Sequence, residues 1–213
     1  CKDSGVQVDP ASDLVKVNGE MVVYRKYVYL MLHKPSGVIS ATEDDRHRTV
    51  IDLLDASYRN FALFPVGRLD KDTEGLLFLT NDGQLAHQLL SPKYRVSKHY
   101  YAEVEGLLQS EDIKRFKQGL TLDDGYTTLP ADLKIVGVDQ DHRSSQAEVT
   151  LVEGKYHQVK RMFATVGKKV VYLKRMAMGG VSLDPALQLG QYRELTEQEL
   201  AILKENESFG SLE

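Results

Sequence analysis

The sequence of 213 residues predicts an α+β fold, and two observations lead to that class. Hydrophobic residues make up 42% of the chain and charged residues 27%, which is typical of a folded globular protein. Short apolar runs that predict buried strands are interspersed with segments of helical periodicity, without the regular alternation of a parallel βαβ fold. At about 150 residues a domain, this length fits one large or two small domains.

The predicted strands are short apolar runs that end at turn residues. The first covers 14–17 and is followed by Asn18-Gly19, a pair typical of a type I′ hairpin turn. A second, 28–32, stops before Pro35 and Gly37, and a third, 76–80, ends at a turn over 81–83. Three further runs complete the set: 100–104, 147–152 and 169–173.

The helices are predicted from their ends and from the spacing of apolar residues. Ser110, followed by two acidic residues, begins one helix, and Gly119 ends it. Thr196 and Glu199 form a capping box before a last helix over 200–203. Between 156 and 167 the apolar residues recur at helical spacing and share one face: Val159, Met162, Phe163 and Val166.

Basic residues are concentrated in one part of an acidic chain. The formal net charge is −4, whereas residues 153–176 contain seven Lys or Arg and one acid. A shorter basic run, 93–98, precedes Tyr100 and Tyr101, and such interleaving favours contact with single-stranded nucleic acid. Two interpretations stay open from composition alone, a phosphate-binding surface and a solvated face. No run approaches the roughly 20 apolar residues that cross a bilayer.

The sequence gives no support for a metal site. A single cysteine forbids an intrachain disulfide or a cysteine cluster, and the six histidines lack the pair spacing of a zinc site. Residues 70–75 imitate the start of a calcium loop, but the twelfth position is Asn81, where a bidentate Glu is expected.

The strongest candidate for chemistry is a carboxylate placed just before an apolar strand, in the run Gly67-Arg68-Leu69-Asp70. One interpretation is a local ion pair between Arg68 and Asp70 that closes a loop. The other is catalytic, because a carboxylate held ionised by a cation in an apolar cleft can attack a sugar carbon. Lys160, from the basic segment, is the first candidate for that cation.

Four motifs carry a resemblance to a known family. Residues 67–83 resemble the signature GRLDxxTxGLLLLTNDG almost residue for residue, and 32–37 resemble LNKPxG with His33 in place of Asn. Residues 98–100 resemble K-T-Y, and 153–163 resemble EGRYHQVKRMF. From Tyr27 to Leu203 the sequence is therefore similar to the RsuA branch of the bacterial ribosomal RNA pseudouridine synthases.

The resemblance implies roles for individual residues. Asp70 matches the nucleophilic aspartate, Arg68 the arginine that helps to extrude the target nucleotide, and Tyr100 the tyrosine that stacks on the uracil. Lys160 matches the basic residue that pairs with the aspartate, and Arg161 beside it stays an alternative partner. The remaining basic and polar motif positions are expected to contact RNA: Lys34, Lys98, His157, Gln158, Arg161, Lys168 and Lys169.

The family implies a mixed, mainly antiparallel sheet flanked by helices, with a basic active-site cleft. Its reaction isomerises one uridine of ribosomal RNA to pseudouridine and needs no cofactor. The Tyr156-His157 pair resembles the small-subunit branch, which favours 16S RNA, or a ribosomal assembly intermediate that contains it, as the partner. The resemblance also implies a cytoplasmic protein that acts as a monomer. The alternatives are the same chemistry on 23S RNA and a non-catalytic RNA-binding module of ribosome assembly.

The resemblance also predicts a division of the chain into three parts. Residues 1–25 are expected to be a remnant of an N-terminal S4-like RNA-binding domain, since the hairpin over 13–20 resembles only the last part of such a domain. Residues 26–205 are expected to form the catalytic domain, and 206–213 a C-terminal tail.

Overall fold

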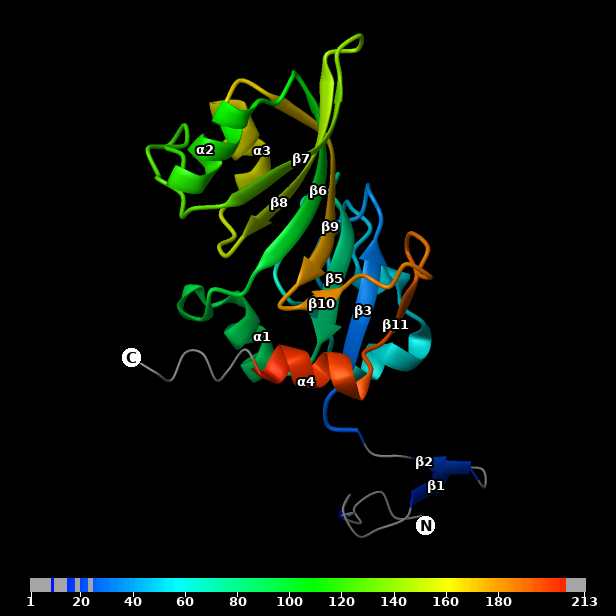
Figure 1. Ribbon diagram of the computed structural model, residues 1–213. Helices are drawn as coiled ribbons and strands as arrows, with labels where there is room; N and C mark the ends of the chain where they lie inside the picture. The colour runs from blue at the N-terminus through cyan, green and yellow to red at the C-terminus, as the bar shows by residue number, and fades with distance from the viewer. Residues whose placement is uncertain (1–8, 10–14, 18–19, 23–24, 206–213) are drawn as a thin grey trace.

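A computed structural model describes residues 9, 15–17, 20–22 and 25–205 (Figure 1). Strands β1 (Val15–Val17) and β2 (Glu20–Val22) pair antiparallel and form a two-stranded sheet separate from the main sheet. The Asn18-Gly19 turn and the tail 206–213 lie outside the described residues. The division into an S4-like remnant, a catalytic domain and a tail stays a prediction.

The main sheet has nine strands and is mixed, as predicted. Along its path the order is β11-β3-β5-β9-β6-β8-β7, with β4 on β5 and β10 on β9. The pairing of β5 with β9 is parallel and every other pairing is antiparallel. The strands are β3 (Tyr29–Lys34), β4 (Phe64–Pro65), β5 (Glu74–Thr80), β6 (Lys98–Glu105), β7 (Asp132–Asp139), β8 (Ser144–Leu151), β9 (Lys169–Met178), β10 (Val181–Ser182) and β11 (Tyr192–Glu194).

Three of the four α-helices in the described residues correspond to predicted ones: α2 (Ser110–Gln118), α3 (Gln158–Thr165) and α4 (Glu197–Glu205). The capping box before α4 is confirmed, because Thr196 N–H donates to Glu199 and Glu199 N–H donates to the Thr196 hydroxyl. The turn expected over 81–83 is wrong. Asp82 instead caps a further helix, α1 (Gly83–Leu90), since its carboxylate accepts from two backbone N–H groups of the first turn.

Two hydrophobic cores lie on opposite faces of the sheet. One contains Leu30 and Leu32 of β3 and packs against α2 and α3 through Phe116 and Phe163. The other contains the intervening Met31 and packs against α1 and α4. Strands that are covered on both faces are apolar without alternation, which explains the continuous runs of β3 and β5.

Strand β6 runs through the middle of the sheet and divides its side chains between the two faces. Tyr100 belongs to the core on the α2 and α3 side, and Tyr101 packs against Tyr172 on the other face. The register between β6 and β9 shifts between His99 and Tyr100. Such a bulge redirects the following side chain.

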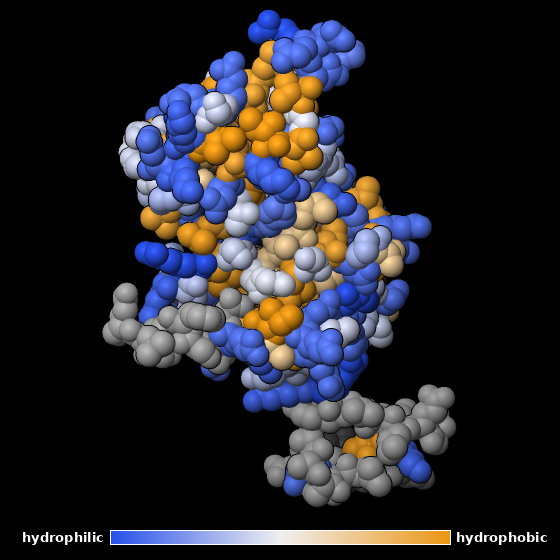
Figure 2. All heavy atoms as spheres, in the orientation of Figure 1, coloured by the Kyte–Doolittle hydropathy of each residue, from blue (hydrophilic) through white to orange (hydrophobic). Residues whose placement is uncertain are grey.

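The outer surface is mostly polar in the view of Figure 2, where apolar residues gather over β7 and α3. Three short 3₁₀ helices, η1 (Ile51–Leu53), η2 (Ala56–Phe61) and η3 (Pro92–Tyr94), complete the described structure. No helix in the described part of the chain has the length and apolar character needed to cross a membrane.

Candidate active site

Asp70 lies in the loop between β4 and β5, and the backbone around it is held by several hydrogen bonds. Thr73 N–H donates to the Asp70 carbonyl at 3.0 Å, and Gly37 N–H donates to the Lys71 carbonyl at 2.8 Å. The Ser40 hydroxyl both donates to the Leu69 carbonyl and accepts from the Leu69 N–H. The carboxylate therefore projects from a fixed loop rather than from a free chain end.

Two side chains of the α3 region contact the Asp70 carboxylate. Lys160 Nζ lies 3.0 Å from Asp70 Oδ2, and His157 Nε2 lies 3.4 Å from Asp70 Oδ1. Lys160 also donates to Asp72 at 2.6 Å. The partners of Asp70 are thus Lys160 and His157 and not Arg68, so the local ion pair between Arg68 and Asp70 is not formed.

The charges of this cluster stabilise one another. Burial opposes the positive charge of Lys160, but its hydrogen bonds to Asp72 and Asp70 outweigh that effect and raise the pKa of the ammonium above its ordinary value. The hydrogen bond from Lys160 is also the main cause that lowers the pKa of Asp72. Lys160 is therefore a permanent cation beside Asp70 at neutral pH.

A pocket opens beside the carboxylate, between the Asp70 loop, β6 and the start of α3. Leu151, Val159 and Leu173 are its apolar residues, and Tyr100 of β6 also lines it. Arg68, with an exposed side chain, lies at the same pocket. The sheet thus brings together three of the predicted residues, Asp70, Tyr100 and Arg68, and α3 adds Lys160.

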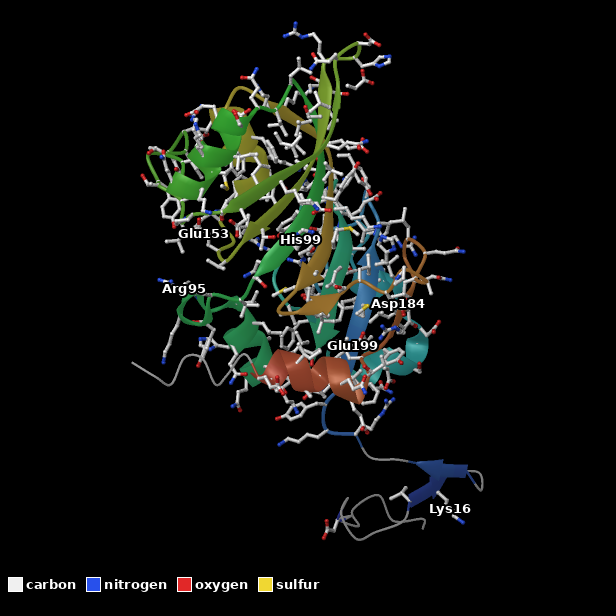
Figure 3. The ribbon with its side chains drawn as sticks, viewed as in Figure 1. Lys16, Arg95, His99, Glu153, Asp184 and Glu199 are labelled. Atoms are coloured by element: carbon white, nitrogen blue, oxygen red, sulfur yellow. The ribbon has the colours of Figure 1, made fainter. Side chains whose placement is uncertain are left out.

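The loop between β8 and α3 forms the other side of the pocket (Figure 3 labels Glu153). Glu153 is buried, and its carboxylate accepts hydrogen bonds from the Tyr126 hydroxyl, the Leu129 N–H and the Gln158 amide. These contacts fix the segment that leads to His157, whose φ of 48° lies in the left-handed region. The His157 ring is therefore held beside Asp70 by the backbone as well as by its own contact.

Three residues predicted to contact RNA are buried and form hydrogen bonds inside the protein, which argues against that role for their side chains. Lys34 is 0% exposed and donates to the carbonyls of Pro35, Lys71 and Thr73. Burial lowers the pKa of Lys34 to about 8. Its physical role is to hold the loop that carries Asp70.

Lys98 and Gln158 are the other two. Lys98 donates to the Val96 carbonyl, and burial, together with the charge of Arg175, lowers its pKa to about 8. Gln158 accepts from the Lys155 N–H and donates to Glu153, so its amide organises the loop before α3. Both side chains use their polar atoms inside the protein.

Arg161 points away from the Asp70 carboxylate. Its guanidinium binds Asp123 and Asp124 in the segment between α2 and β7, with Nε donating to Asp123 at 2.7 Å. Of these two neighbouring cations, Lys160 therefore contacts the Asp70 carboxylate, and Arg161 contacts Asp123 and Asp124 instead.

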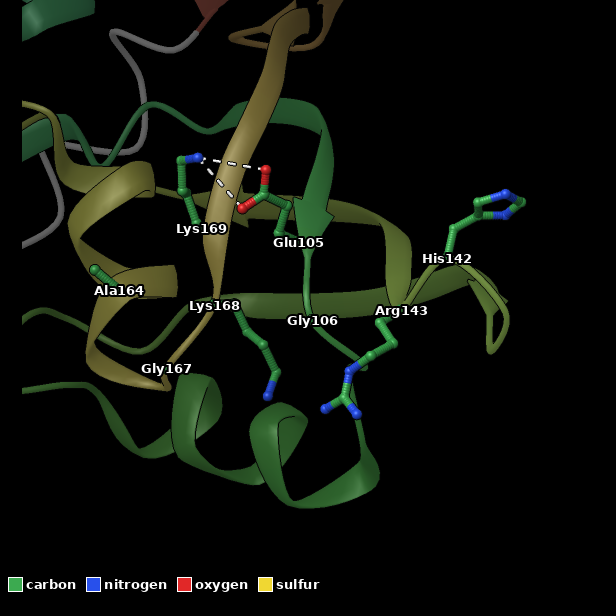
Figure 4. A pocket seen from close by; sticks show the side chains of 8 residues that line it. All are labelled: Glu105, Gly106, His142, Arg143, Ala164, Gly167, Lys168 and Lys169. Atoms are coloured by element: carbon green, nitrogen blue, oxygen red, sulfur yellow. Dashed lines mark hydrogen bonds and ion pairs between the residues drawn. The ribbon is translucent and has the colours of Figure 1, made fainter.

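Lys168 and Lys169 line a separate pocket at the opposite end of β6 (Figure 4). Five residue steps, from Tyr100 to Glu105, separate it from the active site by about 17 Å along the strand. Lys169 forms an ion pair with Glu105, while Lys168 and Arg143 extend to the same side of the pocket. The basic segment 153–176 is therefore not one continuous surface, and its Arg175 is buried.

Sequence reasoning did not assign a role to Glu153, Asp72 or the ring of Tyr156. Glu153 and Tyr156 belong to the motif over 153–163, in which only the basic and polar residues from His157 to Arg161 are predicted to contact RNA or Asp70. Among the described residues no group of three or more His, Cys, Asp or Glu side chains is placed to hold a metal ion. Asp70 and Asp72, the start of the apparent calcium loop, bind Lys160.

Comparison with known proteins matches this chain to one protein family. The family model described as RNA pseudouridylate synthase matches residues 28–165. An uncharacterized RNA pseudouridine synthase of Bacillus subtilis, YtzG, is 53% identical over 96% of this chain and 84% of its own length.

Two relatives have names that specify a ribosomal subunit. The ribosomal large subunit pseudouridine synthase B of Bacillus subtilis is 40% identical over 94% of this chain and 80% of its own. The ribosomal small subunit pseudouridine synthase A of Escherichia coli is 41% identical over 81% of this chain and 72% of its own.

Solved structures share the fold. A crystal structure of a pseudouridylate synthase superimposes with a TM-score of 0.76 at 35% identity, covering 95% of this chain and 84% of the other. An archaeal box H/ACA Nop10–Cbf5 complex gives a TM-score of 0.54 at 18% identity, covering 87% of this chain and 55% of the other, which is a likeness of fold alone.

Proposed function

This chain belongs to the RNA pseudouridylate synthase family, and from that premise we propose that it converts one specific uridine of 16S ribosomal RNA to pseudouridine, with Asp70 as the reacting carboxylate. The observation that carries the proposal is the Asp70 carboxylate between Lys160 and His157, at a pocket lined by Tyr100. A carboxylate that only closed a loop would not need two cationic or titratable partners at the mouth of a pocket.

The chemistry requires one bond to break and another to form at the same sugar carbon. The C1′–N1 bond of the uridine breaks, the base rotates, C1′ bonds to C5, the C5 proton leaves and N1 takes up a proton. Asp70 acts on the ribose, either by attack at C1′ or by removal of a ribose proton to give a glycal. In both routes Lys160 compensates the negative charge of Asp70.

The nucleotide must leave the RNA structure to reach this pocket. Extruding a nucleotide costs a few kcal/mol, which stacking and phosphate contacts offset. Tyr100 supplies a ring inside the pocket, and Arg68 an exposed cation at its side that takes the place of the extruded base. Tyr100 also takes or relays the C5 proton.

The choice of 16S over 23S RNA rests on the Tyr156-His157 pair, which resembles the small-subunit branch. The small-subunit relative of Escherichia coli supports this choice. The large-subunit relative of Bacillus subtilis favours 23S RNA as the second candidate. A non-catalytic RNA-binding module would not need the Asp70, Lys160 and Tyr100 arrangement.

The test uses Asp70→Asn, which keeps the shape of the side chain and removes its charge. Substrates are 16S and 23S transcripts tritiated at C5 of uridine, because the C5 hydrogen is released as the product forms. We expect the parent protein to release tritium from 16S RNA, and Asp70→Asn to release none while it binds RNA with unchanged affinity. The matched control is Asp141→Asn, which removes the same charge from the exposed turn between β7 and β8.

Two results would contradict the proposal. Activity of Asp70→Asn within tenfold of the parent would remove Asp70 from the reaction. Release from 23S RNA alone would leave the chemistry intact and reverse the subunit assignment.

A further inference from the structure

Tyr156 is an exposed aromatic residue next to His157 of the active site, and the proposed reaction does not use it. Tyr156 is 72% exposed, more than any other large hydrophobic residue in the described part of the chain. An aromatic ring left in water forgoes the free energy that its burial would supply. Such exposure beside a catalytic pocket suggests a binding partner that covers the ring.

The ring of Tyr156 is already stacked on one side. Its centroid lies 3.8 Å from that of the His157 ring, with 19° between the planes. His157 in turn contacts the Asp70 carboxylate. One face of Tyr156 is therefore occupied by a residue of the active site, and the exposure of the side chain leaves the other face open.

The backbone beneath this stack is rigidly held. The Lys155 N–H donates to Gln158, and the Tyr156 carbonyl accepts from Arg161 Nη1. Lys155 Nζ lies 4.6 Å from the centroid of the Tyr126 ring. The loop therefore presents Tyr156 in a fixed orientation, and a ligand that stacks on it would meet a preorganised surface.

We propose that Tyr156 is a stacking platform for the unpaired base next to the target uridine. The proposal rests on the proposed function, because it is the extrusion of the uridine that leaves its neighbour without a stacking partner. Every nucleobase has a π face, and aromatic side chains bind unstacked bases in single-stranded RNA. The order along the site is then Asp70, His157, Tyr156 and the neighbouring base.

A second interpretation of the same geometry is purely structural. Tyr156 would then only hold the His157 ring in the orientation that contacts Asp70. The two interpretations differ in what they predict: a platform determines the affinity for RNA, whereas a support for His157 determines the rate of the chemical step.

The test measures affinity and rate separately for Tyr156→Ala, Tyr156→Leu and Tyr156→Phe. The RNA is the ribosomal fragment that releases tritium in the assay above, with fluorescent 2-aminopurine in place of the base on either side of the target uridine. Stacking of a base on an aromatic side chain contributes 1 to 3 kcal/mol by alanine substitution. We therefore expect Tyr156→Ala to raise Kd and KM by between about fivefold and about 150-fold.

Tyr156→Phe keeps the ring and should restore the affinity, whereas Tyr156→Leu keeps apolar bulk without a π face and should not. Binding should quench 2-aminopurine at one flanking position in the parent and in Tyr156→Phe but not in Tyr156→Ala. The matched control is Tyr27→Ala, which removes a tyrosine that is 40% exposed and lies just before β3, at the end of that strand opposite Lys34.

A fall in kcat with unchanged Kd, or no change in either, would overturn the platform. The same binding measurements made with Asp70→Asn separate this proposal from the proposed function. If Asp70→Asn is inactive and still quenches 2-aminopurine, both proposals are supported. If the parent quenches at neither flanking position but releases tritium, the platform is rejected and the proposed reaction is still supported.

Discussion

Replacing Lys160 by Met removes the cation on Asp70 and keeps most of the length of the side chain. At an effective dielectric constant of about 20, two unit charges about 3 Å apart attract by roughly 5 kcal/mol. The side chains of Lys160 and Asp70 are 24% and 25% exposed, so solvent screens part of this attraction. We halve it to about 2 to 3 kcal/mol, which corresponds to a loss of roughly 30- to 150-fold in the rate of the chemical step.

The assay is tritium release under single-turnover conditions at saturating enzyme, which separates the chemical step from RNA binding. Arg161→Met is the matched comparison, because it removes the neighbouring cation, whose partners are Asp123 and Asp124. We expect it to change affinity more than rate. A Lys160→Met variant with the parental single-turnover rate and only weaker binding would make Lys160 a phosphate contact and refute the electrostatic reasoning.

Three further predictions concern stability and register. Lys34→Met leaves three carbonyls without a donor. The pKa of Lys34 is about 8 in the folded chain and 10.5 in the unfolded chain, so the unfolded state binds more protons between these two pH values. The free energy of unfolding of the parent should therefore rise by up to about 3 kcal/mol from pH 8 to 10.5, whereas that of Lys34→Met lacks this rise. Urea titrations of both proteins across this pH range measure the difference. Gly75→Ala should lower the free energy of unfolding by roughly 3 kcal/mol or more, because Gly75 has a φ of +108° and a Cβ there would collide with the backbone of Arg175. A Cβ at Gly83 would meet no atom, so a loss no larger than that of Gly83→Ala would contradict this prediction. Tyr100→Phe should slow tritium release while Tyr101→Phe does not, since Tyr101 faces the opposite side of the sheet; the reverse result would place the reaction on the other face.

The sequence was most informative where local chemistry decides the structure. The apolar run 28–32 became β3, and α2 begins at Ser110 and ends before Gly119, because burial and capping act on neighbouring residues; the capping residue is Gln109, which pairs with Asp112. Helix α1 was missed because Asp82 is equally suited to a turn and to an N-cap. Strand β7 was missed because most of its residues are exposed and its apolar alternation is weak.

The site residues divide along a similar line. The motif around Asp70 identified the carboxylate, but a basic residue type does not reveal which way its side chain points. Lys34 donates into the protein because β3 is covered on both faces. The pairing of Lys160 and not Arg161 with Asp70 depends on the rotation of α3 against the sheet, which no local pattern contains.

The parallel pairing of β5 with β9 has a consequence for how the protein is made. Glu74 pairs with Lys174, 100 residues further along the chain. At a synthesis rate of about 5 to 20 residues per second, the ribosome needs roughly 5 to 20 s to supply that partner after β5 has emerged. Until then β5 has its antiparallel partner β3 but lacks β9, and Leu77 lacks the neighbours that α3 and β9 supply on its face of the sheet. Closing such a long loop is slow as well as late, so β5 waits for β9 with unpaired backbone groups, and the pocket beside Asp70 is completed only when Leu173 of β9 arrives.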